Sequence, residues 1–148
     1  MADLSANFLP DTKTILSAKD YTEASRYSNP AKCELAIRSR IIRRQILSHE
    51  LQCPAAALDF VVKNGKPGLA NERRLQFSTS YSGSLMALAI FDKPIGVDLE
   101  EIDDGASNED VVDALFHVEE IQQISRNSSV DKIKTFYAIW TQKEAFAK

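Results

Sequence analysis

Two carboxylates spaced two residues apart are the feature of this sequence that most directly indicates chemistry. They are Asp98 and Glu100, in the segment 96–100 that reads Gly-Val-Asp-Leu-Glu. Side chains alternate along a β-strand, so both carboxylates would share one face, about 7 Å apart, while Val97 and Leu99 point into a core. Such a pair can bind one hard cation, and Mg²⁺ prefers oxygen ligands of this kind. Taken alone, the motif is explained more simply by an acidic strand end that leads into a loop.

The C-terminal segment 136–148 predicts a helix with a column of functional side chains on one face. Trp140, Glu144 and Lys148 follow one another at intervals of four residues, so they lie along the same side of the helix. Glu144 would supply a third ligand to a cation held by the two strand carboxylates, and Lys148 would reach a phosphate bound to that cation. The simpler alternative is a surface pair of Glu144 and Lys148, worth about 0.3 kcal/mol.

Two further segments could contact a ligand. Gly65, Lys66 and Pro67 form a turn-like tripeptide that can present backbone groups and one positive charge. Residues 77–83, Phe-Ser-Thr-Ser-Tyr-Ser-Gly, are rich in hydroxyl groups that can donate hydrogen bonds to phosphate. An ordinary hairpin loop and a polar turn explain these segments equally well, so neither is specific by itself.

The elements that must position these residues follow from the hydrophobic pattern and the turn signals. Asn29-Pro30 marks the start of the first long helix, because proline suits a first helical turn. Helices are predicted at 31–51, 109–124 and 130–148, and strands at 58–62, 75–80, 85–91 and 95–100. Residues 75–100 would form an antiparallel meander. This order of elements indicates an α+β fold, an antiparallel sheet with packed helices.

Composition places the chain among ordinary globular proteins. Its 148 residues are 44% hydrophobic and 26% charged, which is enough for one domain with a core. The formal net charge of −3 gives no support for nucleic-acid or membrane binding. Cys33 and Cys53 form no CxxC pair and no zinc cluster. Since the sequence shows no signal peptide and no apolar stretch of membrane-span length, we expect a cytoplasmic, reduced setting.

Together, in this order and spacing, these segments resemble the motif series of phosphopantetheinyl transferases of the surfactin-synthetase-activating type. The series consists of 65–67, 77–83, 96–100, Phe116 with Glu120, and 136–148. The combination of Gly-x-Asp-x-Glu with Trp-x-x-Lys-Glu-x-x-x-Lys is highly specific. The resemblance runs from about residue 26 to the last residue.

The resemblance implies both a fold and a reaction. Such proteins are two-fold pseudo-dimers, and residues 1–148 would form a single domain, the N-terminal half with the central helices, while the C-terminal half is absent. They transfer the 4′-phosphopantetheine group of coenzyme A to a serine of an apo acyl, peptidyl or polyketide carrier protein. The reaction needs Mg²⁺ and releases 3′,5′-ADP. We expect the surface that a second half would cover to self-associate or to leave the chain marginally stable.

The resemblance also implies roles for individual residues. The residues expected to bind Mg²⁺ are Asp98, Glu100 and Glu144. The residues expected to act in catalysis are Glu120, as general base, Glu144 and Lys148. The residues expected to bind coenzyme A are Arg44, Lys66, Pro67, Ser80, Tyr81 and Lys148. Trp140 would be a structural aromatic residue.

Two stretches of the chain depart from the family pattern. Ser78 and Tyr81 stand where the family usually has Asn and His, and a tyrosine carries no positive charge at neutral pH. Asp20 and Glu23 stand near where the family has lysines that meet the 3′-phosphate of coenzyme A. We therefore expect weaker coenzyme A binding than in relatives with His. The candidates to replace the missing positive charge are Arg26, Lys32 and Arg40.

Two other functions stay open at this point. A degenerate, non-catalytic module would bind coenzyme A or a carrier protein without turnover, and Tyr81 in place of His favours it. A structural α+β domain would carry the motifs by coincidence, and the ordered series argues against that. A Mg²⁺-dependent thermal shift with coenzyme A separates the ligand-binding functions from the structural one.

Overall fold

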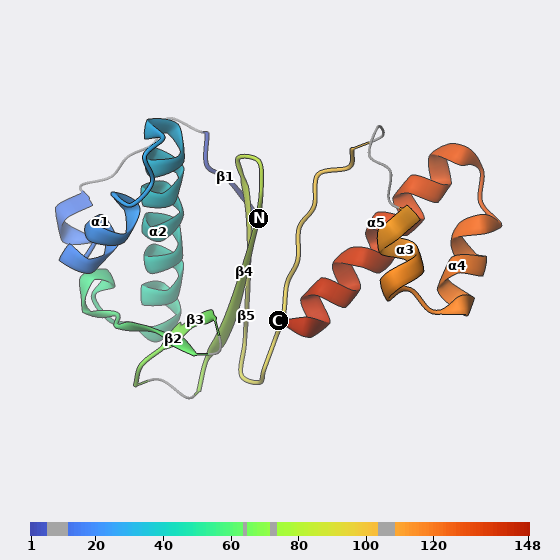
Figure 1. Ribbon diagram of the computed structural model, residues 1–148. Helices are drawn as coiled ribbons and strands as arrows, with labels where there is room; N and C mark the ends of the chain where they lie inside the picture. Colours follow the sequence, from blue (N-terminus) through green and yellow to red (C-terminus); the bar gives the residue numbers. More distant parts are fainter. Residues whose placement is uncertain (6–11, 64, 72–73, 104–108) are drawn as a thin grey trace.

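A long central helix, α2 (Pro30–Leu51), organises the N-terminal part of the computed structural model (Figure 1). The structure describes residues 1–5, 12–63, 65–71, 74–103 and 109–148. Asn29 accepts hydrogen bonds from the backbone N–H groups of Ala31 and Lys32, and Pro30 follows at the first helical position. The helix ends at Gln52, whose left-handed φ of 51° closes the last turn. The helix predicted at 31–51 is therefore confirmed.

The main sheet has three strands in the order β1-β5-β4. These are β1 (Ala2–Asp3), β4 (Gln76–Ser82) and β5 (Leu85–Phe91). β4 and β5 form an antiparallel hairpin that turns at Gly83, which takes a left-handed φ of 55°. The strands predicted at 75–80 and 85–91 are confirmed, whereas β1 carried no recognisable signal in the sequence.

The predicted strand 95–100 does not join this sheet, so the meander predicted over 75–100 is wrong in its last member. The segment runs extended beside the sheet (Figure 1), but its backbone is held by serine side chains of β4 instead of a backbone ladder. Ser78 Oγ accepts a hydrogen bond from Val97 N at 3.2 Å, and Ser82 Oγ accepts one from Glu101 N at 2.7 Å. Because the serines take the place of backbone partners, the segment lies on the face of β4 and not at its edge.

A second, two-stranded sheet pairs β2 (Phe60–Lys63) with β3 (Lys66–Leu69) in antiparallel register. Residues 66–68, which the turn signals placed in a loop, thus belong to a strand. Pro67 is tolerated there because β3 is an edge strand, where a missing backbone N–H does little harm. The strand predicted at 58–62 is confirmed with a shift of its start to Phe60.

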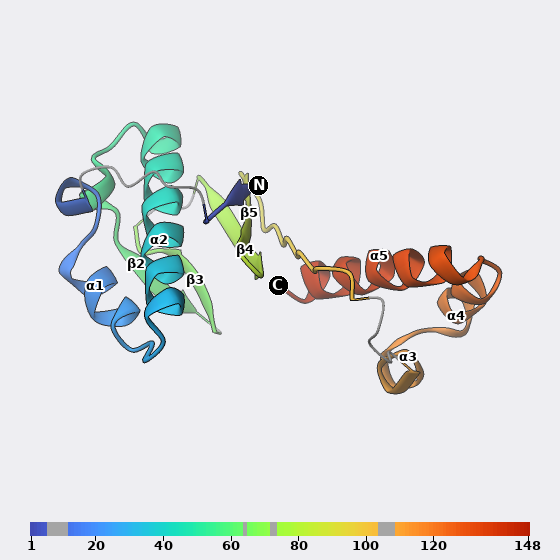
Figure 2. The same ribbon diagram turned by 90° about the horizontal axis from the view of Figure 1, so that it is seen from above.

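The C-terminal part consists of α3 (Glu109–Leu115), α4 (Val118–Ser125) and α5 (Ser129–Ala147). Viewed from above, α5 extends away from the sheet and carries α3 and α4 near the end remote from the C-terminus (Figure 2). The single helix predicted at 109–124 is wrong, because it breaks at Phe116 and His117. Glu120 accepts a hydrogen bond from His117 N at 2.7 Å in a capping box that starts a new helix. The break turns Phe116 into the core.

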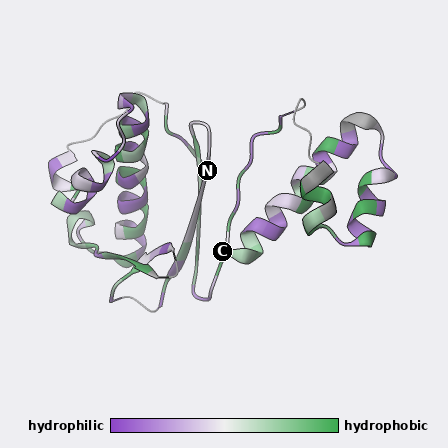
Figure 3. Cartoon of the chain, viewed as in Figure 1, coloured by the Kyte–Doolittle hydropathy of each residue, from purple (hydrophilic) through white to green (hydrophobic). Residues whose placement is uncertain are grey.

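Separate hydrophobic clusters stabilise the two parts. Leu47 of α2 packs with Leu58, Leu69 and Phe77 beneath the sheets. In the helical part, Phe136 of α5 forms the centre of a smaller cluster, and hydrophobic and hydrophilic residues alternate along α4 (Figure 3). The architecture is the expected α+β fold with antiparallel sheets, consistent with one half of the phosphopantetheinyl transferase fold. Within the described ranges, no helix combines the length and apolar character that crossing a membrane requires.

Candidate active site

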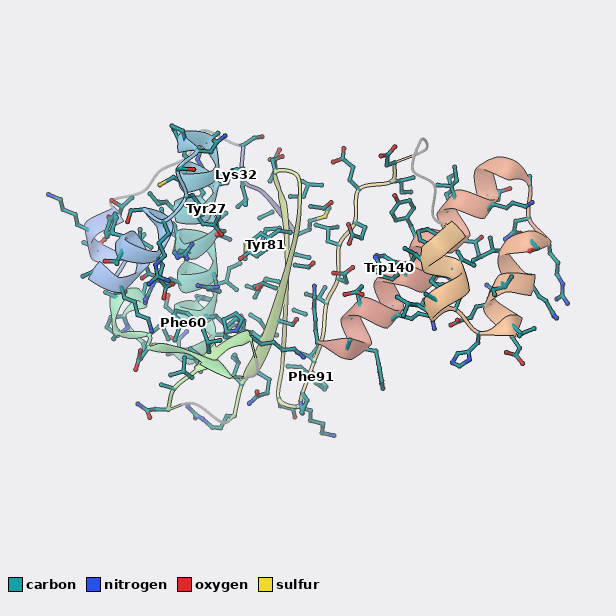
Figure 4. The ribbon with its side chains drawn as sticks, viewed as in Figure 1. Tyr27, Lys32, Phe60, Tyr81, Phe91 and Trp140 are labelled. Atoms are coloured by element: carbon teal, nitrogen blue, oxygen red, sulfur yellow. The ribbon has the colours of Figure 1, made fainter. Side chains whose placement is uncertain are left out.

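Strand β4 separates two groups of side chains, because its residues alternate between two faces of the sheet. The serines at even positions face the extended segment 96–101. The odd positions, Phe77, Thr79 and Tyr81, face α2, where Phe77 is part of the core and the other two line a cavity. Figure 4 shows Tyr81 on the α2 side of β4. Ser80 and Tyr81, both predicted to bind coenzyme A, therefore lie on opposite faces.

On the even face, Lys148 and Asp98 form a polar centre with Ser80. Lys148 Nζ lies 2.6 Å from Asp98 Oδ1 and 2.9 Å from Ser80 Oγ, and Ser80 Oγ donates to Asp98 Oδ1 at 2.8 Å. Lys148 Nζ also donates to the carbonyl oxygen of Val97 at 3.1 Å. The structure thus joins residues from three of the predicted motifs in one hydrogen-bonded group.

The environment of Asp98 keeps its carboxylate charged. Burial works to raise the pKa of Asp98, but hydrogen bonds from Lys148 and Ser80 outweigh burial and hold that pKa below its ordinary value. Its side chain is only 5% exposed, and Oδ2 is buried without a hydrogen-bond partner. A buried, charged oxygen with no donor is a suitable ligand atom for a hard cation.

The three predicted Mg²⁺ ligands do not gather into a ready-made site. Among the residues that the structure describes, no three His, Cys, Asp or Glu side chains are grouped so that they could hold a metal ion. Asp98 contacts the ammonium of Lys148, while Glu100 lies exposed on the extended segment. The assignment of Asp98, Glu100 and Glu144 as ligands therefore remains a prediction, supported here through Asp98 Oδ2.

Gly96 explains how the end of α5 comes so close to the extended segment. A Cβ atom built on Gly96 would lie 1.7 Å from the carbonyl oxygen of Ala145, a distance that no side chain can tolerate. Only glycine allows this approach, which brings Lys148 onto Asp98. A glycine within an extended segment is a signal for close backbone contact, so this role was accessible from the sequence but was not predicted.

Lys66, predicted to contact coenzyme A, lies in this structure against the end of α5. Its Nζ donates to the carbonyl oxygen of Ala147 at 2.8 Å and also contacts the carbonyl oxygen of Lys148. The last carbonyl groups of a helix lack partners within the helix, and a lysine is well suited to cap them. In this structure Lys66 therefore helps to position Lys148.

Glu120, the predicted general base, is tied to α5. Its carboxylate lies 2.8 Å from Lys143 Nζ, and that ammonium also sits 5.4 Å from the centre of the Phe116 ring. The hydrogen bonds from Lys143 and from His117 N hold the pKa of Glu120 below its ordinary value. Trp140 stacks on Phe136 with ring centres 6.4 Å apart, in agreement with a structural role.

On the odd face, a cavity of about 920 Å³ lies between α1 (Ala18–Ala24), α2, β2 and β4. Its volume falls in the range of ligand-binding pockets. Pro67 and Tyr81, both predicted to bind coenzyme A, line it. A smaller pocket of about 170 Å³ reaches Lys148 and shares three residues with the large cavity, Gly65, Pro67 and Thr79. The two pockets are therefore neighbours.

Arg44 also lines this cavity, and its guanidinium is engaged with the protein itself, so its binding of coenzyme A remains a prediction. Arg44 is 2% exposed and pairs with Asp20 at 2.7 Å. It further donates to the carbonyl oxygens of Ala55 and Leu58 and to Ser17 Oγ. Burial works to raise the pKa of Asp20, but hydrogen bonds from Ser17 and the charge of Arg44 hold it low. Arg44 therefore fixes α1 and the segment 55–58 to α2.

The neighbouring Arg43 also lines the cavity, which the sequence did not predict. It lines the same cavity, is 9% exposed and lies with its guanidinium carbon 4.6 Å from the centre of the Phe60 ring. The only available signal was the Arg-Arg pair in a predicted helix, which does not reveal which of the two side chains would be paired. Of the residues proposed to restore positive charge, Lys32 and Arg40 line the cavity and Arg26 does not.

Comparison with known proteins supports the resemblance that the motifs indicated. Residues 94–148 match the family model of the 4′-phosphopantetheinyl transferase superfamily. The chain is 28% identical over 144 residues to slr0495 of Synechocystis sp., whose name assigns it provisionally to these transferases, and 25% identical over 137 residues to the transferase psf-1 of Bacillus pumilus. It is 33% identical over 106 residues to the transferase AcpT of Escherichia coli K12.

The three alignments cover 95%, 92% and 71% of this chain but 58%, 58% and 53% of the respective relatives. The chain therefore spans little more than half the length of the curated relatives it matches. The likeness to the superfamily is confirmed, whereas the surfactin-synthetase-activating type remains a prediction.

Proposed function

Because residues 94–148 match the 4′-phosphopantetheinyl transferase superfamily and relatives with that name align with most of the chain, we propose that this chain carries the coenzyme A site and the reaction centre of such a transferase. Residues 1–148 would be its N-terminal half and central helices. The reaction moves the 4′-phosphopantetheine group of coenzyme A to a serine hydroxyl of an apo carrier protein. The second product is 3′,5′-ADP.

The observation that carries this proposal is the contact of Lys148 with Asp98 and Ser80. These residues belong to three separate motifs, and their polar atoms lie within 2.9 Å of one another. An ammonium group held in this way presents a positive charge at a fixed place, which is what a diphosphate needs during phosphoryl transfer.

In the proposed reaction, the carrier serine oxygen forms a bond to the phosphorus that bears the pantetheine arm. The bond from that phosphorus to the bridging diphosphate oxygen breaks, and this oxygen leaves with the electron pair as part of 3′,5′-ADP. Lys148 would stabilise the negative charge that develops on the leaving group. Lys66 would contribute indirectly, since it caps the helix end that carries Lys148.

The residues present fit a divalent cation in their chemistry. Asp98, through its buried Oδ2, together with Glu100 and Glu144 would hold Mg²⁺. When bound, the ion would offset the charge of the diphosphate.

Glu120 would accept the proton of the carrier serine. A general base must be ionised before it can act, and the ion pair with Lys143 keeps Glu120 ionised at neutral pH. The same pair lowers the pKa of Glu120 and so weakens it as a base. We therefore expect Glu120 to contribute less to the rate than the residues that contact the diphosphate.

Mass spectrometry of an apo carrier protein incubated with this chain, coenzyme A and Mg²⁺ tests the proposal. The expected product is a carrier heavier by one phosphopantetheine group. Lys148→Ala should lower the rate at least roughly a hundredfold, as expected when a group that stabilises transition-state charge is removed. Glu119→Gln, at an exposed position in the first turn of α4, is the matched control and should leave the rate unchanged.

A carrier that stays unmodified, in the presence of a chain that shows no thermal shift with coenzyme A, would contradict the proposal. A second candidate is a module that binds coenzyme A without turnover. The direct Lys148–Asp98 ion pair and the scattered carboxylates favour it. A thermal shift with coenzyme A but no modified carrier would select this second function.

A further inference from the structure

Helix α2 presents a basic wall to the large cavity, and acidic residues neutralise two of the three arginines in it. Three arginines of α2 line the cavity: Arg40, Arg43 and Arg44. Arg44 pairs with Asp20 at 2.7 Å, and Arg40 pairs with Glu23 at 3.3 Å. The two acidic residues that stand where lysines were expected thus serve as partners for these two arginines.

Arg43 is the exception in this wall. Its Nε atom is buried and has no hydrogen-bond partner, and across the described residues its guanidinium takes part in no hydrogen bond or ion pair. One face of the guanidinium is covered by the Phe60 ring. Burial lowers the pKa of Arg43, and the negative charge of Asp20 offsets this effect only in part. An unpaired buried charge is costly, and an anion in the cavity would compensate it.

The surroundings of Arg43 suit a ligand with two anionic groups. Tyr81 lines the same cavity from β4 and can offer a hydroxyl donor. The small pocket at Lys148 shares the lining residues Gly65, Pro67 and Thr79 with the cavity, so the two pockets are neighbours. Positive charge is therefore available at two neighbouring places, on either side of β4.

We propose that Arg43, assisted by Tyr81, binds the 3′-phosphomonoester of coenzyme A, while the diphosphate of the same molecule reaches Lys148. The inference rests on the proposed function and deepens it, because it names the residue that selects coenzyme A over cosubstrates without a 3′-phosphate. Arg43 supplies the positive charge that Tyr81 lacks. A guanidinium can donate two parallel hydrogen bonds to a phosphate, which favours it over a lysine at this place.

Isothermal titration of the whole chain with coenzyme A and with 3′-dephospho-coenzyme A tests the inference. Hydrogen bonds to a charged group predict that the wild type binds coenzyme A roughly 10- to 100-fold more tightly than the dephospho form. In Arg43→Met the two affinities should become equal within about twofold. Arg43→Lys should give an intermediate ratio. The matched control Arg126→Met, at the exposed end of α4, should keep the wild-type ratio.

A wild-type ratio near one, or an unchanged ratio in Arg43→Met, would overturn the inference. In either case binding of dephospho-coenzyme A and carrier modification would leave the proposed function standing, so the two failures are distinguishable. If the wild type binds neither cosubstrate, both ideas fail. Circular dichroism checks the fold of each variant. If Arg43→Met does not fold, the affinities of Arg43→Lys for 3′,5′-ADP and for 5′-AMP are measured instead. A ratio of these two affinities equal to that of the wild type overturns the inference.

Discussion

The N-terminal part and the helical part of this chain bury different kinds of residue. Around α2, the structure buries the charged side chains of Asp20, Arg43 and Arg44 next to an apolar core. The described side chains from α3 to the end of α5 include the buried Phe116, Phe136 and Ile139 but no buried charge. The first part therefore buries charge in the wall of its cavity, at a cost in stability, whereas the second part has an apolar core with its Glu120–Lys143 ion pair outside that core.

The largest expected effect comes from breaking the buried ion pair of the N-terminal part. Arg44→Met leaves Asp20 charged and buried with only the more distant Arg40, 3.9 Å away, as an ion-pair partner, so the free energy of unfolding should fall by about 4 kcal/mol. Urea denaturation followed by circular dichroism measures this change. Arg26→Met, at an exposed position, is the control and should change little. If Arg44→Met is no less stable than the control, the pair does not hold α1 to α2.

The corresponding test of the helical part is Phe136→Ala. Removal of this buried ring should cost about 3 kcal/mol. Trp140 is the single tryptophan of the chain and stacks on Phe136, so its fluorescence reports on this region alone. The fluorescence transition should move to lower urea by more than the circular dichroism transition of the whole chain. Equal shifts of both probes would show that the two parts unfold as one unit.

The contact between the two parts can be broken at Gly96. In Gly96→Ala the new methyl group would meet the carbonyl oxygen of Ala145, so α5 must move away. We expect a loss of about 2 kcal/mol, typical of overpacking. The variant should also bind coenzyme A more weakly because Lys148 leaves Asp98. Val97→Ala, one residue along, is the control that adds no atoms. An unchanged affinity in Gly96→Ala would separate the Lys148 contact from cosubstrate binding.

Acid should affect the two parts unequally, and this is the smallest expected effect. The folded-state pKa values of Asp20 and Asp98 lie below the ordinary value of 3.8. Stability from these ionised groups is complete well above pH 3.8 and is lost as the pH falls through the folded-state pKa values. Thermal melts should therefore shift to lower temperature below about pH 4. The Trp140 signal should shift less, because no buried carboxylate is described around it. Equal shifts of the Trp140 signal and of the whole chain would contradict the expectation that acid affects the two parts unequally.

The sequence predicted those elements whose ends carry local signals. The cap at Asn29-Pro30 and the turn at Gly83 fix α2 and the β4–β5 hairpin, and both were predicted. The segment 95–100 has the residue pattern of a strand. This pattern does not say whether its backbone hydrogen bonds go to the backbone of another strand or to the side chains of serines. Phe116 interrupts a helical pattern because the core draws it inward, which is a tertiary effect.

The sequence predicted several residues of the candidate site but not how they contact one another. The motifs identified Asp98, Lys148 and Ser80, which the structure joins. They did not distinguish Arg43 from Arg44, since neighbouring residues of a helix point about 100° apart and only the position of Asp20 decides which one is paired. The turn-like tripeptide likewise does not reveal that Lys66 contacts the carbonyl oxygen of Ala147.

The alternation along β4 makes adjacent residues of one strand independent targets for change. In the proposed binding mode, substitutions at Thr79 or Tyr81 change the surface that meets the nucleotide end of coenzyme A, while Ser78 and Ser80 on the reverse side stay in place. Cosubstrate preference could therefore be redesigned, or could drift over generations, without loss of the chemical step. A library of variants at Thr79 and Tyr81 alone would therefore be the smallest one that tests the acceptance of synthetic pantetheine donors.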